Sequence, residues 1–326
     1  MNLGIIGAGW IADKMAYTIA GLPKEEGITT YGIASRDLGK AQAFARKYSV
    51  PVAYGSYREL VEDPNVDLVY IATPHSHHYD HTKLALEGGK AVLCEKAFMA
   101  NGAEAREILD LAHSRGLFIT EAIWTRYMPL SHKVKELIDS GEIGEPRLIR
   151  ASLCYQMDNK ERILRPDLCG GALLDLGVYC INFARMFFGG DIASVESSCV
   201  KFPGGMDKYD SMELFYADGK VAHLTTAAAC LCNREGIICG NEGYIVVENI
   251  NCPERVRVFH DYKQTAEYLP PAGQVTGYEY QVMASRDAMR DGLLESEYMP
   301  HQETIAIMDM MDSLRAEWGV KYPMDR

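Results

Sequence analysis

The sequence has no excess of basic residues, no cysteine motif of the metal-binding kind and no long apolar run. Its formal net charge of −12 argues against a nucleic-acid partner, which would require a basic face. Its nine cysteines are scattered without a C-x-x-C pair, which indicates reduced structural thiols in a cytoplasm. No apolar run approaches the roughly 20 residues that span a bilayer, and the N-terminus lacks the pattern of a signal peptide. We therefore expect a cytoplasmic protein without a membrane partner.

The first twelve residues carry the most informative pattern. A short apolar strand runs into Gly7-x-Gly9-x-x-Ala12, and an amphipathic segment follows. Gly7 permits a tight turn, Gly9 lets the backbone approach a pyrophosphate, and Ala12 lets helix and strand pack closely. The amides at the helix start, from Trp10 and Ile11 onward, would then face the anion. The pattern predicts a dinucleotide-binding turn.

Strand and helix patterns alternate through the first 120 residues and change afterwards. Apolar strand patterns at 28–35, 66–72, 91–95 and 117–120, with helical patterns between them, predict a doubly wound parallel sheet of the Rossmann type. After about Glu121 several strand patterns follow one another, starting at residues 147, 194, 212, 221, 237, 244 and 256, with a hairpin turn at 217–220. We therefore expect an α/β protein with a Rossmann domain at 1–121 and an α+β domain at 122–326.

The predicted second domain has a largely antiparallel, open sheet and ends in a helix at about 303–318. One strand, 222–231, alternates small apolar and polar residues, as expected of a face that meets another sheet. We expect a homodimer or a higher homo-oligomer that associates through this sheet.

The residues after the second strand pattern bear on the choice of dinucleotide. An acidic residue at this strand tip holds the ribose 2′-hydroxyl of NAD, whereas an arginine accommodates the 2′-phosphate of NADP. Here the tip reads Ser35-Arg36-Asp37, followed by Lys40. Ser35 stands where the acid is expected, Arg36 offers a planar fork suited to phosphate, and Asp37 can cap the next helix. We predict NADP rather than NAD; the alternative is that Arg36 and Lys40 are solvated surface charges.

Two polar segments follow apolar strands at the sheet edge where ligands of open α/β folds bind. The first is Thr73-Pro74-His75-Ser76-His77-His78, and the second is Glu95-Lys96-Ala97. A lysine after an apolar strand is unusual, and its amine could handle a proton; the alternative is a solvated strand end. The histidines resemble metal ligands by number, but adjacent histidines at a helix start point in different directions. We expect no metal.

A third polar cluster lies in the predicted second domain. The segment Gly170-Gly171-Ala172-Leu173-Leu174-Asp175-Leu176-Gly177-Val178-Tyr179 places a carboxylate and a phenol four residues apart. If the segment is helical from Leu173, Asp175 and Tyr179 share a face. Together with a lysine they would form a proton-handling and hydroxyl-binding cluster. The alternative is a pair on a helix surface.

Taken together, these motifs resemble the glucose–fructose oxidoreductase, inositol dehydrogenase and MocA (Gfo/Idh/MocA) family over essentially the full chain. The segment Glu121–Pro129 resembles the branch of dimeric dihydrodiol dehydrogenase and D-xylose-type aldose dehydrogenases. The resemblance implies that Lys96 is the catalytic lysine and that Asp175 and Tyr179 complete the site. It also implies a nicotinamide cofactor contacted by Thr73, Pro74, His75, His78, Glu95 and Lys96.

The chain departs from the family pattern at three of these positions. Tyr179 stands where many members carry histidine, so a phenol replaces an imidazole as the acid/base. Ala97 replaces the usual proline after the lysine, which removes a rigid turn. Asn182 stands where many relatives have a further aspartate, which weakens an inositol-type reading.

These observations predict an NADP-dependent oxidoreductase that transfers hydride between the nicotinamide and a secondary alcohol or hemiacetal carbon of an aldose or a trans-dihydrodiol. Tyr179 and Lys96 would take the hydroxyl proton, and Asp175 would orient a substrate hydroxyl or Lys96. Candidates for the pocket wall are Trp124, Tyr127 and Arg147. Two alternatives stay open: a non-catalytic dinucleotide-binding sensor of the same fold, and a biliverdin-reductase-like enzyme, for which the polar cluster of the second domain would be surplus.

Overall fold

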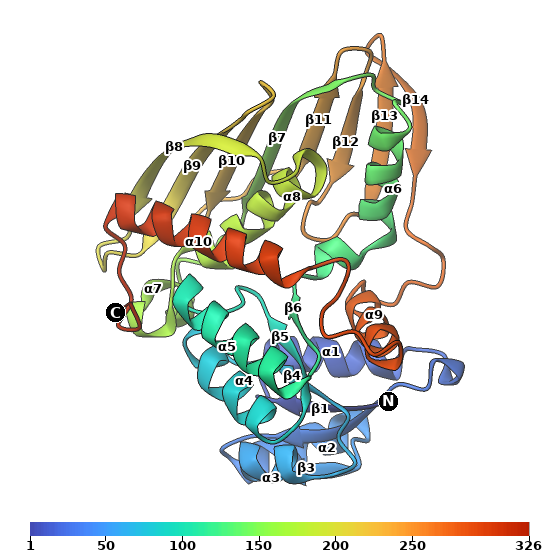
Figure 1. The fold of residues 1–326 in the computed structure, drawn as a ribbon, viewed down its shortest axis with the longest axis vertical. Coiled ribbons are helices and arrows are strands. Elements are labelled where there is room, and N and C mark those ends of the chain that lie inside the picture. Colours follow the sequence, from blue (N-terminus) through green and yellow to red (C-terminus); the bar gives the residue numbers. More distant parts are fainter. Residues whose placement is uncertain (326) are drawn as a thin grey trace. The chain divides into compact units, whose positions relative to one another are not determined.

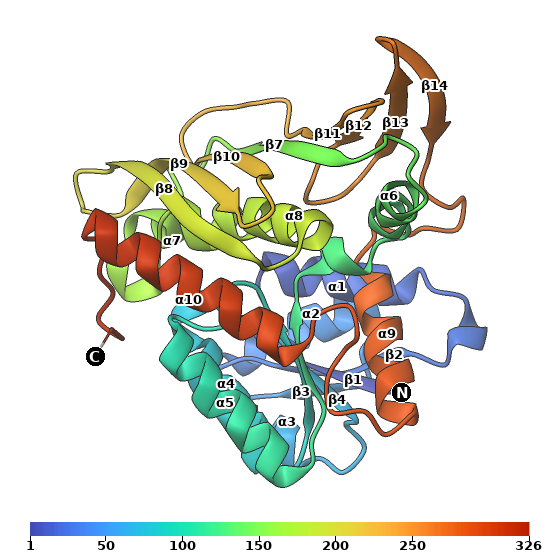
Figure 2. The same cartoon turned by 45° about the horizontal axis from the view of Figure 1, so that its top comes forward.

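The computed structural model describes residues 1–325, which form two compact units (Figures 1 and 2). The first unit consists of Met1–Ile123 together with Gln274–Asp309, and the second consists of Trp124–Gly273 together with the chain from Met310 onward. The contacts thus group residues 274–309 with the N-terminal unit, whereas the sequence-based division assigned them to the second domain.

The first unit contains a six-stranded parallel sheet with the strand order β3-β2-β1-β4-β5-β6. This order is that of a doubly wound dinucleotide-binding fold, as the alternating sequence pattern predicted. The strands are β1 (Asn2–Ile6), β2 (Thr29–Ala34), β3 (Val52–Tyr54), β4 (Leu68–Ile71), β5 (Ala91–Glu95) and β6 (Ile119–Ala122). The helices between them are α1 (Trp10–Ala20), α2 (Leu38–Tyr48), α3 (Tyr57–Glu62), α4 (His78–Glu87) and α5 (Gly102–Arg115).

Three of these helices begin where the sequence places a capping residue. The Ser56 hydroxyl accepts a hydrogen bond from the Glu59 amide (3.2 Å), and Asn101 Oδ1 accepts one from the Glu104 amide (2.9 Å). Asp37 Oδ1 caps α2 by accepting from the Lys40 amide (3.2 Å). These caps fix the direction in which each helix leaves the sheet edge.

Residues 274–309 close the first unit with α9 (Glu279–Arg290) and the beginning of α10 (His301–Trp318). The Thr276 hydroxyl lies 2.7 Å from that of Thr18 on α1, and Arg286 Nη1 lies 2.7 Å from Glu26 Oε2. His301 Nε2 lies 2.9 Å from the Ile119 carbonyl oxygen. The helix α10 starts at His301, two residues before the start predicted for it at about 303.

The second unit contains an eight-stranded sheet with the order β14-β13-β12-β11-β7-β10-β9-β8. Only the β7–β10 pair is parallel, so the sheet is largely antiparallel, as predicted. The strands are β7 (Pro146–Cys154), β8 (Ile192–Lys201), β9 (Asp207–Tyr216), β10 (Val221–Ala227), β11 (Gly236–Gly240), β12 (Tyr244–Glu248), β13 (Arg255–His260) and β14 (Lys263–Tyr268). Only β14 has no counterpart among the predicted strands.

The helix α8 (Val178–Phe188) packs on β7 and β10, and α6 (Pro129–Asp139) packs on β13 (Figure 2). The expectation that no apolar run is long enough to span a bilayer was wrong on length and composition. Residues 166–188 include an 18-residue window of mean hydropathy 1.3, which is long and apolar enough to cross a membrane by length and composition alone. Within this unit, however, 89% of that window is buried, as in the core helix of a soluble protein.

Candidate active site

The turn from β1 to α1 has the geometry that its two glycines predict. Gly7 has φ +100°, and a Cβ there would lie 2.8 Å from the Ala72 carbonyl oxygen, so a side chain would collide with the end of β4. Gly9 precedes α1 in an extended conformation, and a Cβ there would meet nothing within 4 Å. Ala12 is fully buried where the helix packs on the sheet. The open space at Gly9, next to the helix N-terminus, suits a pyrophosphate.

Two further predicted cofactor residues lie at the start of α1. Trp10 is 69% exposed, with Lys14 Nζ 5.8 Å from the centre of its ring, and Ile11 is half-buried.

At the tip of β2, the Ser35 hydroxyl accepts a hydrogen bond from the Asp37 amide (3.2 Å). Since Asp37 also caps α2, its carboxylate is turned to the helix, and no acidic side chain stands at position 35 or 36. Arg36 and Lys40 are exposed. The charge of Arg36 also reaches α4, where burial, His77, His78 and Arg36 together lower the pKa of His81 to about 4. This edge of the unit is thus cationic and accessible.

The segments after β4 and β5 are tied together by two histidines. His75 Nε2 lies 3.1 Å from the Lys96 carbonyl oxygen. The fully buried His78 has Nδ1 2.9 Å from the Ala97 and 3.1 Å from the Phe98 carbonyl oxygen, and Nε2 2.8 Å from that of Thr73. Both histidines therefore fix the backbone around Lys96, whose side chain is half-buried. The Lys96–Ala97 peptide bond is cis.

Burial lowers the pKa of His78 to about 4, against the three carbonyl contacts, which raise it. At neutral pH the ring is uncharged, so it acts as a hydrogen-bonded brace between the ends of β4 and β5. Thr73 contributes a further contact there, with its hydroxyl 3.0 Å from His81 Nδ1, and Pro74 precedes the short helix His75–His77. Among residues 1–325, no group of three or more His, Cys, Asp and Glu side chains is arranged to hold a metal.

Glu95, the last residue of β5, is buried and accepts a hydrogen bond from the hydroxyl of the fully buried Tyr70. Glu95, a predicted cofactor residue, thus has a buried carboxylate that the Tyr70 hydroxyl stabilises. This hydrogen bond lies directly before Lys96 in the chain.

In the second unit, the predicted catalytic segment is helical but not uniformly α-helical. Leu173–Gly177 form a π-helix, and α8 continues from Val178. Asp175 is buried, and its Oδ1 forms an ion pair with Arg162 Nη1 at 2.9 Å. Single turns of π-helix occur frequently at functional sites because they reorient side chains.

Tyr179 is buried one turn later and contacts a second predicted site residue. Trp124 Nε1 donates a hydrogen bond to the Tyr179 hydroxyl oxygen (3.0 Å). An indole N–H can only donate, so the phenol oxygen is the acceptor in this pair. The structure thus brings Trp124 and Tyr179 together, from the short helix Trp124–Tyr127 and from α8.

The same short helix is fastened to α8 by a second contact. The buried Arg126 Nε donates to Asn182 Oδ1 (2.5 Å), and Asn182 Nδ2 donates to the Val178 carbonyl oxygen (2.7 Å). Asn182, which replaces the aspartate of many relatives, therefore serves as a structural link. Tyr127 is buried in the same short helix.

The structure does not bring Arg147 to this cluster. Arg147 lies at the start of β7, with its side chain 62% exposed and paired with Glu145 at 2.8 Å. Gly177, in the predicted catalytic segment, lies near Thr226 of β10. Thr226 pairs with Leu153, which is at the opposite end of β7 from Arg147. The role of Arg147 as a pocket residue has no support in this geometry.

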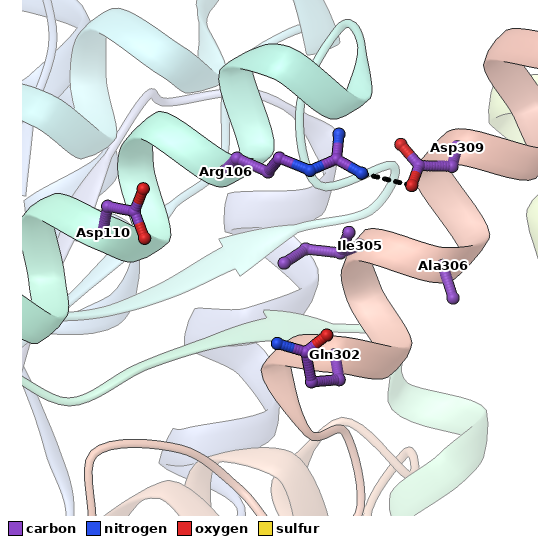
Figure 3. A pocket seen from close by; sticks show the side chains of 6 residues that line it. All are labelled: Arg106, Asp110, Gln302, Ile305, Ala306 and Asp309. Carbon is purple, nitrogen blue, oxygen red and sulfur yellow. Dashed lines mark hydrogen bonds and ion pairs between the residues drawn. The ribbon is translucent and has the colours of Figure 1, made fainter.

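None of the predicted site residues lines a surface hollow in the first unit (Figure 3). Its walls come from α5 and the beginning of α10: Arg106, Asp110, Gln302, Ile305, Ala306 and Asp309. The Arg106 guanidinium forms an ion pair with Asp309, and the two side chains are 48% and 43% exposed. An exposed pair of this kind contributes little free energy, and we assign the hollow no role.

Sequence reasoning missed four residues around the segment 170–179: the buried Arg126, Asp207 and Asp210, and the exposed Arg162, whose guanidinium pairs with Asp175. Arg162 lies in a polar run, 158–162, that reads as surface. Asp207 and Asp210 are three apart on a strand, a spacing that normally places side chains on opposite faces. No local signal distinguishes these residues from solvated charges.

The geometry agrees with comparisons to known proteins. Residues 1–122 match the family of oxidoreductases with an NAD-binding Rossmann fold (GFO_IDH_MocA), and residues 131–246 match the GFO/IDH/MocA C-terminal domain. The chain belongs to the Gfo/Idh/MocA oxidoreductase family.

Curated family members match along their whole length. Trans-1,2-dihydrobenzene-1,2-diol dehydrogenase of Mus musculus is 34% identical over 337 residues, with 100% of this chain and 99% of that protein covered. The Homo sapiens enzyme of the same name is 33% identical over 334 residues, with 100% and 99% covered. This Gfo/Idh/MocA protein is therefore an oxidoreductase with a binding unit for a nicotinamide cofactor.

Solved structures show the same fold. A 3-ketoreductase from Actinomadura kijaniata, in complex with NADP and TDP-benzene, aligns with a TM-score of 0.85 at 24% identity over 97% of both chains. An aldose-aldose oxidoreductase from Caulobacter crescentus complexed with glycerol aligns with a TM-score of 0.88 at 19% identity, over 98% of this chain and 97% of that one. The family fold thus extends over nearly the full chain.

Proposed function

We propose that this protein is an NADP-dependent dehydrogenase that oxidises a secondary alcohol or hemiacetal carbon of an aldose or a trans-dihydrodiol. The observation that carries the proposal is the buried hydrogen bond from Trp124 Nε1 to the Tyr179 oxygen, one turn beyond a buried, ion-paired Asp175. A buried phenol that accepts from a fixed donor is held in one orientation. A fixed orientation suits an acid/base, which must lie within hydrogen-bond reach of the proton that it moves.

Each catalytic side chain has a distinct part in the reaction. The nicotinamide, when bound, supplies the hydride acceptor. Tyr179 and Lys96 remove the hydroxyl proton of the substrate, and Asp175, held by Arg162, orients a substrate hydroxyl or the lysine. Trp124 offers a flat indole face as well as its N–H, and such a face suits either a sugar or an aromatic diol.

The choice of NADP rests on the tip of β2. Position 35 carries a serine, so no carboxylate stands there to bind a ribose 2′-hydroxyl, and the carboxylate of Asp37 caps α2. The exposed side chains of Arg36 and Lys40 supply positive charge. We propose that Arg36 pairs with the 2′-phosphate, for which a guanidinium has the matching geometry. Trp10, Ile11 and the turn Gly7–Gly9 then hold the pyrophosphate.

The substrate class draws on the relatives, whose names place them among dihydrodiol dehydrogenases and aldose oxidoreductases. We also propose that the protein works in the cytoplasm and as a homodimer that associates through the eight-stranded sheet.

Turnover of a panel of aldoses, inositols and trans-dihydrodiols with NADP and with NAD tests this proposal. We expect NADP to be preferred, and Lys96→Ala and Tyr179→Phe to lower turnover by at least about 100-fold with NADP binding retained. Lys24→Ala and Tyr262→Phe are matched controls, since both side chains are exposed. Near-normal turnover in both catalytic variants would contradict the mechanism, and a tenfold preference for NAD would contradict the cofactor assignment.

A further inference from the structure

Two aspartates of the second unit are buried side by side. Asp207 is 0% and Asp210 2% exposed, and both belong to β9. The register of β9 against β8 shifts at Lys208: Lys201 pairs with Asp207, but Val200 pairs with Tyr209. This β-bulge inserts one extra residue, so two side chains three positions apart come to the same face.

Asp207 contacts the glycine-rich turn that leads into the catalytic segment. Its Oδ2 accepts a hydrogen bond from the Leu173 amide (2.5 Å), the first residue of the π-helix. Its Oδ1 would lie 1.9 Å from a Cβ at Gly171, which has φ +110°. Only a glycine at 171 therefore lets the carboxylate reach the Leu173 amide.

Asp210 completes the pair from the other side. Its Oδ2 accepts a hydrogen bond from the Thr226 hydroxyl on β10 (2.8 Å). The remaining oxygen, Oδ1, of each carboxyl accepts no hydrogen bond from the described residues, although the two carboxyls lie within hydrogen-bond reach of each other. Two buried carboxylates would repel at that distance, whereas a carboxylic acid donates to a carboxylate.

The electrostatics identify which partner carries the proton. Burial raises the pKa of Asp207, and hydrogen bonds from the Leu173 and Ala172 amides, which favour its charged form, oppose this shift. Burial and the charge of Asp207 raise the pKa of Asp210 to about 9, against smaller opposite effects of Thr226 and Cys199. The other titratable groups facing the pair are Cys199 on β8, Cys180 on α8 and Tyr322 near the C-terminus, all neutral at pH 7. Asp207 is thus the carboxylate and Asp210 the acid.

We propose that Asp207 and Asp210 are positioning residues of the enzyme, in which one shared proton holds the turn 170–173 and so sets the place of Asp175 and Tyr179. Loss of that proton puts two negative charges in one buried site, which drives the carboxyls apart and releases the Leu173 amide. The catalytic roles of Asp175 and Tyr179 in this statement rest on the proposed function.

The pH profile of turnover separates this role from a merely structural one. In the wild-type protein we expect kcat to fall above a pH of about 9, when Asp210 ionises. An amide donates to Asp207 without titrating, so Asp210→Asn should keep kcat at pH 7 within about threefold and move the alkaline fall up by at least about one pH unit. Asp191→Asn, an exposed aspartate, is the matched control and should leave the profile unchanged.

A second variant tests the contact to the turn. We expect Asp207→Ala to lower kcat by about 10- to 100-fold through misplacement of the segment, with the KM for NADP unchanged, because the cofactor turn belongs to the other unit. Asp207→Asn retains an acceptor for the Leu173 amide and a donor for Asp210, and should restore most of kcat. An Asp210→Asn profile identical to that of wild type, or Asp207→Ala with wild-type kcat, would overturn the proposal.

A spectroscopic readout keeps this test independent of the chemistry. In a Trp10→Phe, Trp318→Phe background, Trp124 is the remaining tryptophan, and its emission reports on the hydrogen bond to Tyr179. We expect an emission change near pH 9 that Asp210→Asn abolishes, while ionisation of exposed tyrosines persists in both proteins. Full turnover of Tyr179→Phe, together with the emission transition in the background that keeps Tyr179, would refute the catalytic assignment and leave the carboxyl pair standing. Absence of the transition in that background would overturn the pair.

Discussion

Replacing Gly171 with alanine tests the packing on which the catalytic segment depends. The added methyl group would lie 1.9 Å from Asp207 Oδ1 and 2.6 Å from its Cγ, far inside contact distance. The carboxylate must therefore move and give up the Leu173 amide, which is a loss of about 1.5–3 kcal/mol for a hydrogen bond to a charged group. The φ of +110° adds about 1–2 kcal/mol for a residue with a Cβ. The expected loss in unfolding free energy is about 2.5–5 kcal/mol.

Gly205→Ala is the matched control for the backbone contribution. Gly205 has φ +90°, but a Cβ there would meet nothing within 4 Å. We therefore expect this variant to lose only the backbone part, about 1–2 kcal/mol. The difference between the two variants isolates the collision with Asp207.

Urea unfolding followed by tryptophan emission in a Trp10→Phe background measures both losses, because Trp124 and Trp318 then report on the second unit. With a slope of about 2 kcal/mol per molar urea, the midpoint of Gly171→Ala should fall by about 1.3–2.5 M. In an Asp207→Ala background the same substitution should cost no more than Gly205→Ala does. Equal losses at positions 171 and 205 in the wild-type background would refute the reasoning.

Three further predictions concern other parts of the site. Because His78 is neutral in the folded protein, with a pKa of about 4, and titrates near 6.5 when unfolded, its contribution to stability is complete above pH 6.5 and is lost as the pH falls toward 4. The unfolding free energy of wild type, measured by urea unfolding, should therefore fall over this window by up to about 1.4 kcal/mol per pH unit more steeply than that of His78→Asn; parallel pH dependences would exclude His78 as the cause. Trp124→Phe removes the N–H donated to Tyr179 and should lower kcat about tenfold, whereas Trp318→Phe, which loses a similar bond to Ser197, should not; equal kcat values would contradict the role of the bond. Arg36→Ala should raise the KM for NADP at least about tenfold and leave the KM for NAD nearly unchanged. A parallel change in both KM values would show that Arg36 does not bind the 2′-phosphate.

The parts of the fold that local chemistry determines could be predicted from the sequence. Gly7 lies at positive φ against the Ala72 carbonyl, a position that only glycine fills without strain, and the caps Ser56 and Asn101 mark their helices by side-chain type alone. The strand 91–95 was predicted with its observed bounds because all five of its residues are buried and apolar except the last.

Other features depend on contacts between distant residues and left no local pattern. The pairing of Asp207 with Asp210 requires a bulge whose position is set by β8, and the burial of Arg126 requires Asn182 on a separate helix. Arg147 shows the converse, because its charge type suits a pocket, whereas its position at the start of β7 depends on strand pairing and lies far along the strand from Leu153, the partner of Thr226. A sequence motif identified the catalytic candidates, but it contained no information on the residues that position them, such as Asp207 and Arg126.

The discontinuity of the first unit has a consequence for how such a protein can be recombined. The chain passes from one unit to the other at three points, after Ile123, after Gly273 and after Asp309. A fragment that stops at Ile123 lacks the partners that Thr276 and Arg286 provide to α1 and its following turn. A chimera that takes its cofactor specificity from a relative must therefore exchange two pieces of sequence at once. Inheritance of one piece alone would leave mismatched surfaces inside the same unit.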